Sequence, residues 1–479
     1  MPLPELPEKR LGEAIDEATP VETGHRRTLL ALAAVTLIGG LLRLHFAAFP
    51  VKPIGDEVYY LQMARSIAAG EGHTAQNSLA LRPPAHPWLL SFFVDTDLPA
   101  DAPVVDQVRP LVRLQVVLGT LLIALTACLT WLLFGPRAAL VASSIAALYP
   151  TLIAYSHYLW SETFFSVLIL GGLIEVVLVA RTGSWWHALA AGVLFGVGTL
   201  TREVALPVAA MCALWWLWMA PPDRRGVALA QGAGMLVACL AVVAPWTYRN
   251  HRVLGRFVPV ASIGWLAMRE GNTLPSGSWL HPDPEGLREW RRQYFALSEM
   301  EAADMARRET LQLIAEEQPS WIFEKLVRTT VLLLSPDSGI FKKLSRGGYG
   351  EVGLAGVRVV LVATILTYLG VAVLGVIGMS LRPGRGLVLL PVLIFAVVFA
   401  VHLIANATSR FRVPWMPLVM AYAGHAVVSW RTIPEVITGR RRTILASALF
   451  LVLGGCTVYF LEDAVSLWEK ATYVDPSRP

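Results

Sequence analysis

Residues 28–60, TLLALAAVTLIGGLLRLHFAAFPVKPIGDEVYY, contain the pattern that decides the fold of this chain. The first two thirds form a predominantly apolar run, with Arg43 and His45 near its end, and about 20 such residues span the hydrocarbon core of a membrane. The run follows His25-Arg26-Arg27 and has no small-residue cleavage site after it, so we interpret it as a membrane span and not as a secretion signal. Two acids, Asp56 and Glu57, come soon after it. The stretch therefore predicts a membrane helix followed by acidic side chains on the far side.

The composition of the whole chain agrees with a membrane protein. Of its 479 residues, 55% are hydrophobic and only 16% are charged, whereas soluble proteins carry about 25% charged residues. A disordered chain would need low hydrophobicity and high net charge. An outer-membrane barrel would show alternation in short segments of about ten residues, but the apolar runs here are long and continuous. The composition thus predicts an all-α polytopic membrane protein.

Apolar runs of spanning length recur along the chain and predict about eleven transmembrane helices. The predicted spans are 28–49, 110–133, 138–155, 161–180, 185–201, 204–220, 227–247, 355–380, 387–408, 413–430 and 443–461. One of them holds Gly192, Gly196 and Gly198, a spacing typical of closely packed membrane helices.

The distribution of arginine predicts the orientation of these spans, because positive residues gather in short cytoplasmic loops. The short basic connections carry Arg137, Arg181, Arg224, Arg225, Arg382, Arg385 and Arg440-Arg441-Arg442. We therefore expect residues 1–27 to form a cytoplasmic tail and residues 28–461 to form the membrane domain. Two long loops, 50–109 and 250–353, then lie outside, and with eleven spans the tail 462–479 lies outside too.

The two long outer loops have helical patterns of their own. Apolar residues recur at near-helical spacing over Asp56–Ala69, and a second short apolar helix is predicted over Pro87–Val94. In the second loop, Pro284–Gln318 is rich in charged helix formers. Trp321–Leu334 is too short to span a membrane and begins as an amphipathic segment, so we expect it in the membrane interface.

Arginine should be scarce on the outer side, yet six arginines fall at or near the predicted outer ends of spans. They are Arg82, Arg202, Arg249, Arg252, Arg410 and Arg412. An anion at headgroup depth would explain them, because guanidinium groups bind phosphate in a bidentate manner and stay charged when half buried. The alternative is that each side chain extends separately to lipid headgroups.

Acids and histidines on the same side each have a structural and a functional interpretation. Asp56 and Glu162 could cap their own helices or take part in catalysis. Adjacent helical residues point about 100° apart, so Asp56 and Glu57 cannot serve one site in the same way. His86 and the other outer histidines, His157 and His402, have no metal-ligand spacing, which favours packed histidines.

An ordered series of short motifs resembles the polyprenyl-phosphate-sugar-dependent glycosyltransferases of the GT-C superfold. The resemblance is to the bacterial family related to protein O-mannosyltransferases and the lipid A aminoarabinose transferase, of glycosyltransferase family 39 type. It covers about residues 30–425. The motifs are Gly55-Asp56-Glu57-Val58-Tyr59-Tyr60, Arg82-Pro83-Pro84-Ala85-His86-Pro87, Tyr149-Pro150, Ser161-Glu162-Thr163, Leu200-Thr201-Arg202, Pro245-Trp246-Thr247-Tyr248-Arg249-Asn250, Gly271-Asn272 and Arg410-Phe411-Arg412-Val413-Pro414.

The resemblance implies roles for several of these residues. Asp56 corresponds to the catalytic or metal-proximal carboxylate, and Glu162 stands for a second acid of the site. Glu57, next to Asp56 in the same motif, is a further candidate catalytic residue. Arg82 corresponds to the basic residue that contacts the donor phosphate. The other outer arginines proposed to bind that phosphate are Arg202, Arg249 and Arg410.

Metal dependence stays open at this stage, and the candidate ligands of a divalent ion are Asp56, Glu162 and His86. Some relatives have Glu-Lys-Pro-Pro where this chain has Leu81-Arg82-Pro83-Pro84. The acid that precedes the basic residue is therefore missing here, which counts against a metal site of that kind.

The expected function is an inverting transfer of a sugar from a polyprenyl-phosphate donor to a hydroxyl at the outer face of the cytoplasmic membrane. The expected partners are this donor, membrane lipids and a lipid, glycan or protein acceptor. Nucleic acid is not among them, because no basic stripe with interleaved aromatic residues is present. The alternatives are a transporter or flippase of an anionic lipid-phosphate substrate and an inactive relative that acts as a scaffold.

Overall fold

The computed structural model describes most of the chain between residues 25 and 433. The residues not described within this range are 50–51, 76–77, 100–101, 274–283, 337, 346–347, 350–351 and 382–383, and residue 454 is described as well. The described residues do not include most of the predicted N-terminal tail, 1–27, of which only the last residues are described. They also do not include the predicted C-terminal tail, 462–479, or, apart from residue 454, the predicted span 443–461.

Six helices within the described part of the chain are long and apolar enough to cross a membrane. They are α2 (His25–Phe46), α5 (Val104–Phe134), α8 (Glu162–Thr182), α11 (Arg225–Leu254), α17 (Leu354–Ser380) and α18 (Arg385–Ile404). Each coincides with a predicted span. The chain is a helical, multi-pass membrane protein, as its composition predicts.

Shorter apolar helices occupy four more of the predicted spans. They are α6 (Pro136–Leu148), α9 (Trp185–Thr199), α10 (Ala205–Met219) and α19 (Met416–Val428). The predicted span 138–155 is divided at Tyr149, whose backbone is extended, and a short helix, α7 (Pro150–Tyr155), follows. The break has a local cause, because proline disfavours the helical conformation in the residue before it. The count of eleven spans is therefore not confirmed.

Close packing of α9 against α11 is the interaction that the glycine spacing predicted. A Cβ atom at Gly192 would lie 2.3 Å from the carbonyl oxygen of Met235, and one at Gly196 would lie 2.9 Å from that of Cys239. No side chain fits at these distances, so the two backbones can approach only because glycine stands at both positions.

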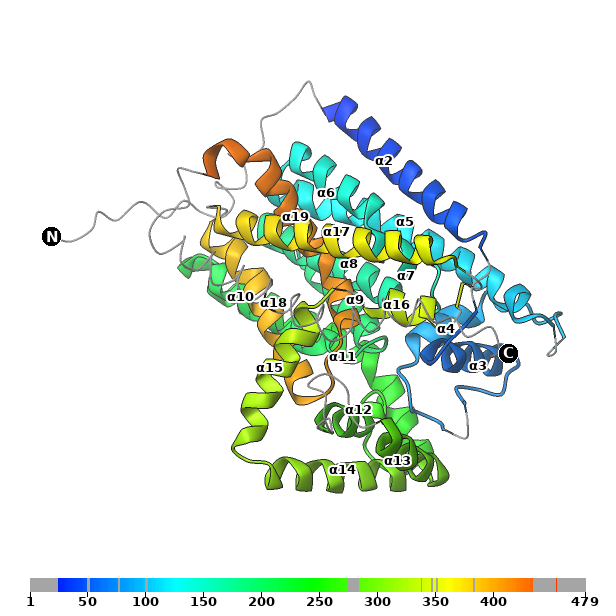
Figure 1. Cartoon of the computed structure of the whole chain (residues 1–479). Coiled ribbons are helices and arrows are strands. Elements are labelled where there is room, and N and C mark those ends of the chain that lie inside the picture. The colour runs from blue at the N-terminus through cyan, green and yellow to red at the C-terminus, as the bar shows by residue number, and fades with distance from the viewer. Residues whose placement is uncertain are drawn as a thin grey trace.

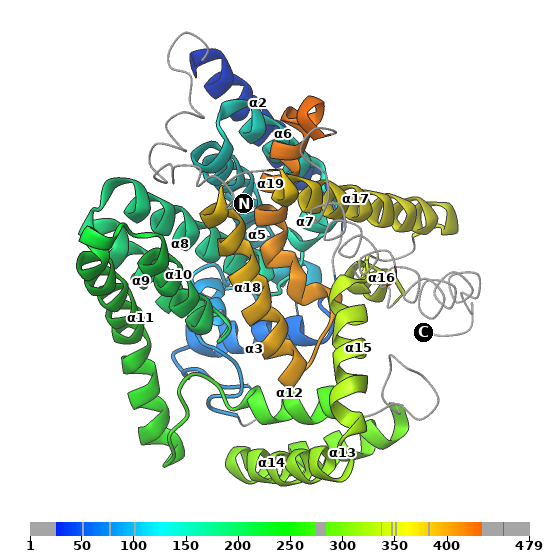
Figure 2. The same ribbon diagram turned by 90° about the vertical axis from the view of Figure 1, so that its left-hand side faces the viewer.

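The two long segments between spans gather at one end of the helix bundle (Figures 1 and 2). The first long loop forms α3 (Asp56–Ala68) and α4 (Ala85–Ser91), and both agree with the predicted helices. The second loop forms α12 (Ile263–Asn272), α13 (Pro284–Ala296), α14 (Glu299–Glu316), α15 (Ser320–Leu334) and α16 (Ser338–Ser345). The short helix η2 (Ser409–Trp415) leads into α19 at the same end.

The helix α8 passes through the centre of the bundle and packs against α5, α9 and η2. Its first residue, Glu162, therefore lies under the loops at that end of the bundle, next to η2. This placement brings the outer arginines and acids from distant parts of the sequence into one region.

Candidate active site

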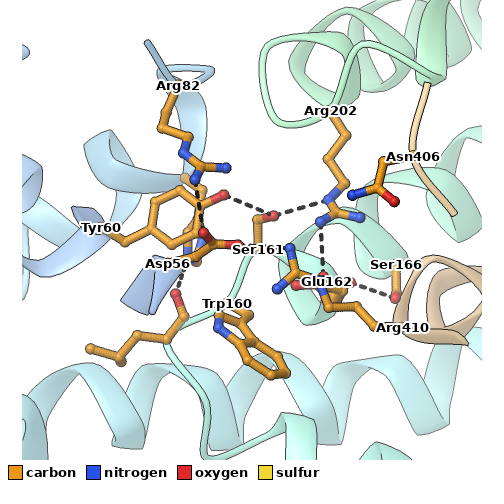
Figure 3. A network of polar contacts seen from close by, with 12 residues as sticks. Asp56, Tyr60, Arg82, Trp160, Ser161, Glu162, Ser166, Arg202, Asn406 and Arg410 are labelled. Carbon is orange, nitrogen blue, oxygen red and sulfur yellow. Dashed lines mark hydrogen bonds and ion pairs between the residues drawn. The ribbon is translucent and has the colours of Figure 1, made fainter. Parts of the chain in front are cut away.

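Asp56 is the first residue of α3, and its carboxylate lies between two arginines from other segments (Figure 3). Its Oδ1 atom accepts a hydrogen bond from Arg82 at 2.7 Å, and Oδ2 accepts one from Arg410 at 2.8 Å. The helix begins after Gly55, whose φ of 56° lies in the left-handed region that favours glycine. Gly55 occupies the N-cap position without a side-chain cap, so the capping interpretation of Asp56 does not hold.

Glu162 forms the second acidic position of the same network. Its side chain is only 1% exposed, and Oε1 lies 2.8 Å from a terminal nitrogen of Arg202 and 2.9 Å from Nε of Arg410. The second oxygen, Oε2, is buried without a hydrogen-bond partner. Ser161 holds the N-cap position of α8, and no side-chain cap bond forms there. Arg410 thus bridges two carboxylates that are separated by more than a hundred residues in the sequence.

Neutral and aromatic side chains fix the orientation of these arginines. The Ser161 hydroxyl accepts a hydrogen bond from Nε of Arg202 at 3.1 Å. The guanidinium of Arg410 lies 4.8 Å from the centre of the Trp160 ring, and that of Arg202 lies 5.2 Å from the centre of the Phe411 ring. Such cation–π contacts hold a guanidinium in place without neutralising its charge. The arginines are therefore positioned as charged groups.

The charges of the network do not cancel. The three arginines, Arg82, Arg202 and Arg410, stand against two carboxylates, which leaves one positive charge. Burial by itself raises the pKa of Asp56, but the charges of Arg82 and Arg410 outweigh it and hold that pKa well below its usual range. Asp56 is therefore ionised at neutral pH. The network as a whole can attract an anion.

Two of the predicted site residues lie elsewhere. Arg249 donates a hydrogen bond to the carbonyl oxygen of Leu79 at 2.6 Å and lies over the ring of Trp246. It therefore supports the chain segment that leads to Arg82. Glu57 points away from Asp56 into a fully buried contact with Lys343. The different directions of these adjacent acids agree with the 100° step between helical residues.

The three candidate metal ligands do not converge on one point. Both oxygens of Asp56 contact arginines, and Oε1 of Glu162 does the same. Nε2 of His86 lies 2.9 Å from the carbonyl oxygen of Leu159, and its ring packs against Tyr60. Among the described residues no group of three His, Cys, Asp or Glu side chains could hold a metal ion. In this arrangement the residues do not fit a metal site.

Sequence reasoning missed several side chains that shape the site. Trp160 precedes a predicted acid but carries no charge that would mark it, and Ser161 belongs to one of the motifs but the resemblance assigns it no role. Lys343 lies in a short basic segment of the second loop that is similar to many surface segments. Glu299 accepts hydrogen bonds from the backbone N–H groups of Leu79 and Ala80, and so anchors the segment before Arg82. Each of these contacts joins residues far apart in the sequence, so no local pattern indicates them.

Comparison with known proteins finds similarity only among solved structures. No protein-family model matches the sequence, and no curated protein does either. An oligosaccharyltransferase from Archaeoglobus fulgidus with a tethered acceptor peptide is 14% identical, with a TM-score of 0.48, and covers 93% of this chain. The chain spans 55% of the length of that protein.

Two further structures have a similar relation to the chain. The oligosaccharyltransferase AglB from Archaeoglobus fulgidus, in complex with an inhibitory peptide and a dolichol-phosphate, is 13% identical, with a TM-score of 0.48 and coverage of 94% and 56% of the two chains. ArnT from Cupriavidus metallidurans, bound to undecaprenyl phosphate, is 16% identical, with a TM-score of 0.46 and coverage of 94% and 76%. At such identities and scores the similarity concerns the fold at most, and it does not assign chemistry to this chain.

Proposed function

We propose that the chain is a membrane glycosyltransferase that moves a sugar from a polyprenyl-phosphate donor to an acceptor hydroxyl, with inversion at the anomeric carbon. The observation that carries the proposal is the network in which Arg410 contacts both Asp56 and Glu162. Arg82 forms a second ion pair with Asp56, and Arg202 forms a second one with Glu162. The network combines a net positive charge for binding a phosphate with a carboxylate that can accept a proton.

The arginines are the proposed binding site for the donor phosphate. Arg82, Arg202 and Arg410 come from three different segments and leave one positive charge after pairing with the two acids. The network lies at the first residues of α3 and α8, at the end of the spans that we expect to face outward. A polyprenyl phosphate in the outer leaflet would have its phosphate at this headgroup depth. Guanidinium groups suit that ligand because they bind phosphate through paired hydrogen bonds.

Asp56 is the proposed general base. In the arrangement described here its carboxylate is weakly basic, because Arg82 and Arg410 hold its pKa well below the usual range. A donor phosphate competes for the same two guanidinium groups. When they turn to the phosphate, the carboxylate loses its stabilising partners and its basicity rises. The base therefore becomes effective when the donor is bound.

The proposed transfer step involves the acceptor hydroxyl, the donor, Asp56 and the arginines, and it balances in atoms and charge. The acceptor oxygen forms a bond to the anomeric carbon while its proton passes to Asp56, and the bond from that carbon to the phosphate oxygen breaks. The electron pair leaves with the polyprenyl phosphate, whose additional charge is stabilised by the arginines. A single displacement of this kind inverts the anomeric centre.

The direct test is release of polyprenyl phosphate by the purified full chain in lipid nanodiscs. We would supply undecaprenyl phosphates that each carry one hexose or pentose, with envelope lipids, glycans and proteins from cells lacking the chain as acceptors. Mass spectrometry should detect free undecaprenyl phosphate and a glycosylated acceptor. Asp56→Asn should reduce this turnover by about 10²–10⁴-fold, the usual contribution of general base catalysis. Movement of an intact labelled donor lipid across a vesicle bilayer, without release, would support a flippase and overturn the proposal.

A further inference from the structure

The buried contact between Glu57 and Lys343 joins the first outer loop to the second. Both side chains are almost completely inaccessible, with 1% and 0% exposure, and the Lys343 ammonium donates to Oε2 of Glu57. The two residues are 286 positions apart in the sequence. Removing two charges from water costs energy that their attraction often fails to recover, so such a pair is weak evidence for a role in stability alone. Its position one residue after Asp56 suggests a different use.

Glu57 also fixes the backbone on both sides of the site. Its Oε2 accepts a hydrogen bond from the N–H group of Ile54 at 2.8 Å, which holds the segment before Asp56. Its Oε1 accepts one from the N–H group of Leu159 at 2.9 Å, three residues before Glu162. The Glu57 carboxylate therefore links the start of α3 to the segment that leads to Glu162.

The peptide group of Leu159 is held from its other side as well. Nε2 of His86 lies 2.9 Å from the Leu159 carbonyl oxygen. Burial lowers the pKa of His86 to about 4, so the ring is neutral at pH 7 and can donate from Nε2. His86 follows Arg82 by four residues. Leu159 is thus fixed by the residue after Asp56 and by a residue close to Arg82.

Lys343 is a residue of α16, and its contacts join that helix to the segment around Leu159. Its ammonium lies 4.9 Å from the centre of the Tyr158 ring, next to Leu159. Its carbonyl oxygen accepts a hydrogen bond from Gly348, whose own carbonyl accepts one from the N–H group of Lys52 at 2.8 Å. A Cβ atom at Gly348 would lie 2.8 Å from the Lys343 side chain, so the backbone at Gly348 packs closely against that side chain.

We infer that Glu57 and Lys343 are positioning residues, which set the place of Asp56 relative to Arg410 and Glu162 and make catalysis depend on the second outer loop. Neither side chain touches the reacting atoms. The inference rests on the proposed function, because it concerns the rate of that same transfer. Misplacement of a reacting group by about 1 Å can cost about 10²-fold in rate.

The test compares Glu57→Gln, Lys343→Met and the double variant in the full chain. Glu71→Gln is the matched control, since Glu71 is an exposed acid of the same loop. We would measure kcat and KM for the donor that the wild type turns over, the Kd of undecaprenyl phosphate, and thermal unfolding. The double variant leaves no uncompensated buried charge, so it tests the role even where a single variant folds poorly.

Each positioning variant should lower kcat by about 10²-fold and leave the Kd of undecaprenyl phosphate unchanged, because the three arginines remain. The double variant should lose no more than the worse single variant, since the two residues act as one unit. A kcat equal to that of the wild type in the folded double variant would overturn the inference, and so would a loss confined to donor affinity. If the wild type shows no transfer activity, the proposed function itself is wrong. If Asp56→Asn loses transfer but the variants at Glu57 and Lys343 do not, only the positioning role is wrong.

Discussion

Arg410→Gln is the substitution that most directly tests the bridging network. Arg410 contacts Asp56 at 2.8 Å and Glu162 at 2.9 Å, and it is one of the three arginines proposed to bind the donor phosphate. A hydrogen bond to a charged group contributes about 1.5–3 kcal/mol. Since about 1.4 kcal/mol corresponds to a tenfold change in affinity, the variant should bind undecaprenyl phosphate about ten- to a hundredfold more weakly.

Arg412→Gln is the matched control for this measurement. Arg412 lies in the same short helix, η2, but it donates to the carbonyl oxygens of Leu333 and Ser335 and lies over the ring of Tyr368. Its loss should lower the melting temperature without changing the affinity of the folded protein for the lipid. Binding would be followed by titration of nanodisc-embedded protein with undecaprenyl phosphate. Equal affinities of Arg410→Gln and the wild type would refute the assignment of Arg410 to the phosphate.

Arg410→Gln should also change how the stability of the fold depends on pH. Arg410 is one of the three arginines that keep the pKa of Asp56 below its unfolded value, so its contact with Asp56 stabilises the fold above a pH of about 4. That contribution disappears as the pH falls from this value through the lower folded pKa. The difference in melting temperature between the wild type and Arg410→Gln should therefore be larger at pH 7 than at pH 3. An equal difference at both pH values would contradict the charge-based explanation.

The remaining predictions concern the donor site, the topology and the helix packing. Arg82→Ala should raise the donor KM more than Arg224→Ala, because only Arg82 belongs to the network; equal effects in the transfer assay would exclude it from the phosphate site. A cysteine introduced at Glu71 should react with an impermeant thiol reagent on intact cells and one at Asp223 should not, and the opposite labelling would reverse the predicted orientation. Gly192→Ala places a Cβ atom 2.3 Å from a carbonyl oxygen of α11. It should cost about 1–3 kcal/mol of stability, and thermal unfolding identical to that of the wild type would show that the contact relaxes freely.

The features that the sequence predicts well are those determined by local composition. Apolar runs indicate where helices lie, because a membrane helix must satisfy its own backbone hydrogen bonds and expose apolar side chains. The start of α3 at Asp56 and the close contact at Gly192 follow from patterns within a few residues. The division of the predicted span 138–155 could also have been read from Pro150, which ends the helical conformation of Tyr149.

The composition of the candidate site is only partly a local property. Excess arginine at the predicted outer ends of spans predicts an anion site, but it does not distinguish Arg249 from Arg202. The structure does, since Arg202 contacts Glu162 whereas Arg249 supports the backbone at Leu79. The difference depends on which neighbours the fold supplies. Lys343 is the extreme case, because its partner Glu57 lies in the other outer loop and nothing near Lys343 in the sequence indicates it.

The pairing of Asp56 with Arg82 and Arg410 gives the order in which the site should work. A free carboxylate in an apolar surrounding would be costly to ionise, and two unpaired arginines at the same place would repel each other. The attraction between Asp56 and the two arginines offsets these costs in the donor-free site, but it also lowers the pKa of Asp56 and makes it a weak base. In the proposed mechanism, an acceptor that enters before the donor therefore meets a carboxylate that is too weak a base to take its proton. Because an anion is needed to draw the arginines away from Asp56, the proposed mechanism requires that donor binding precede proton transfer.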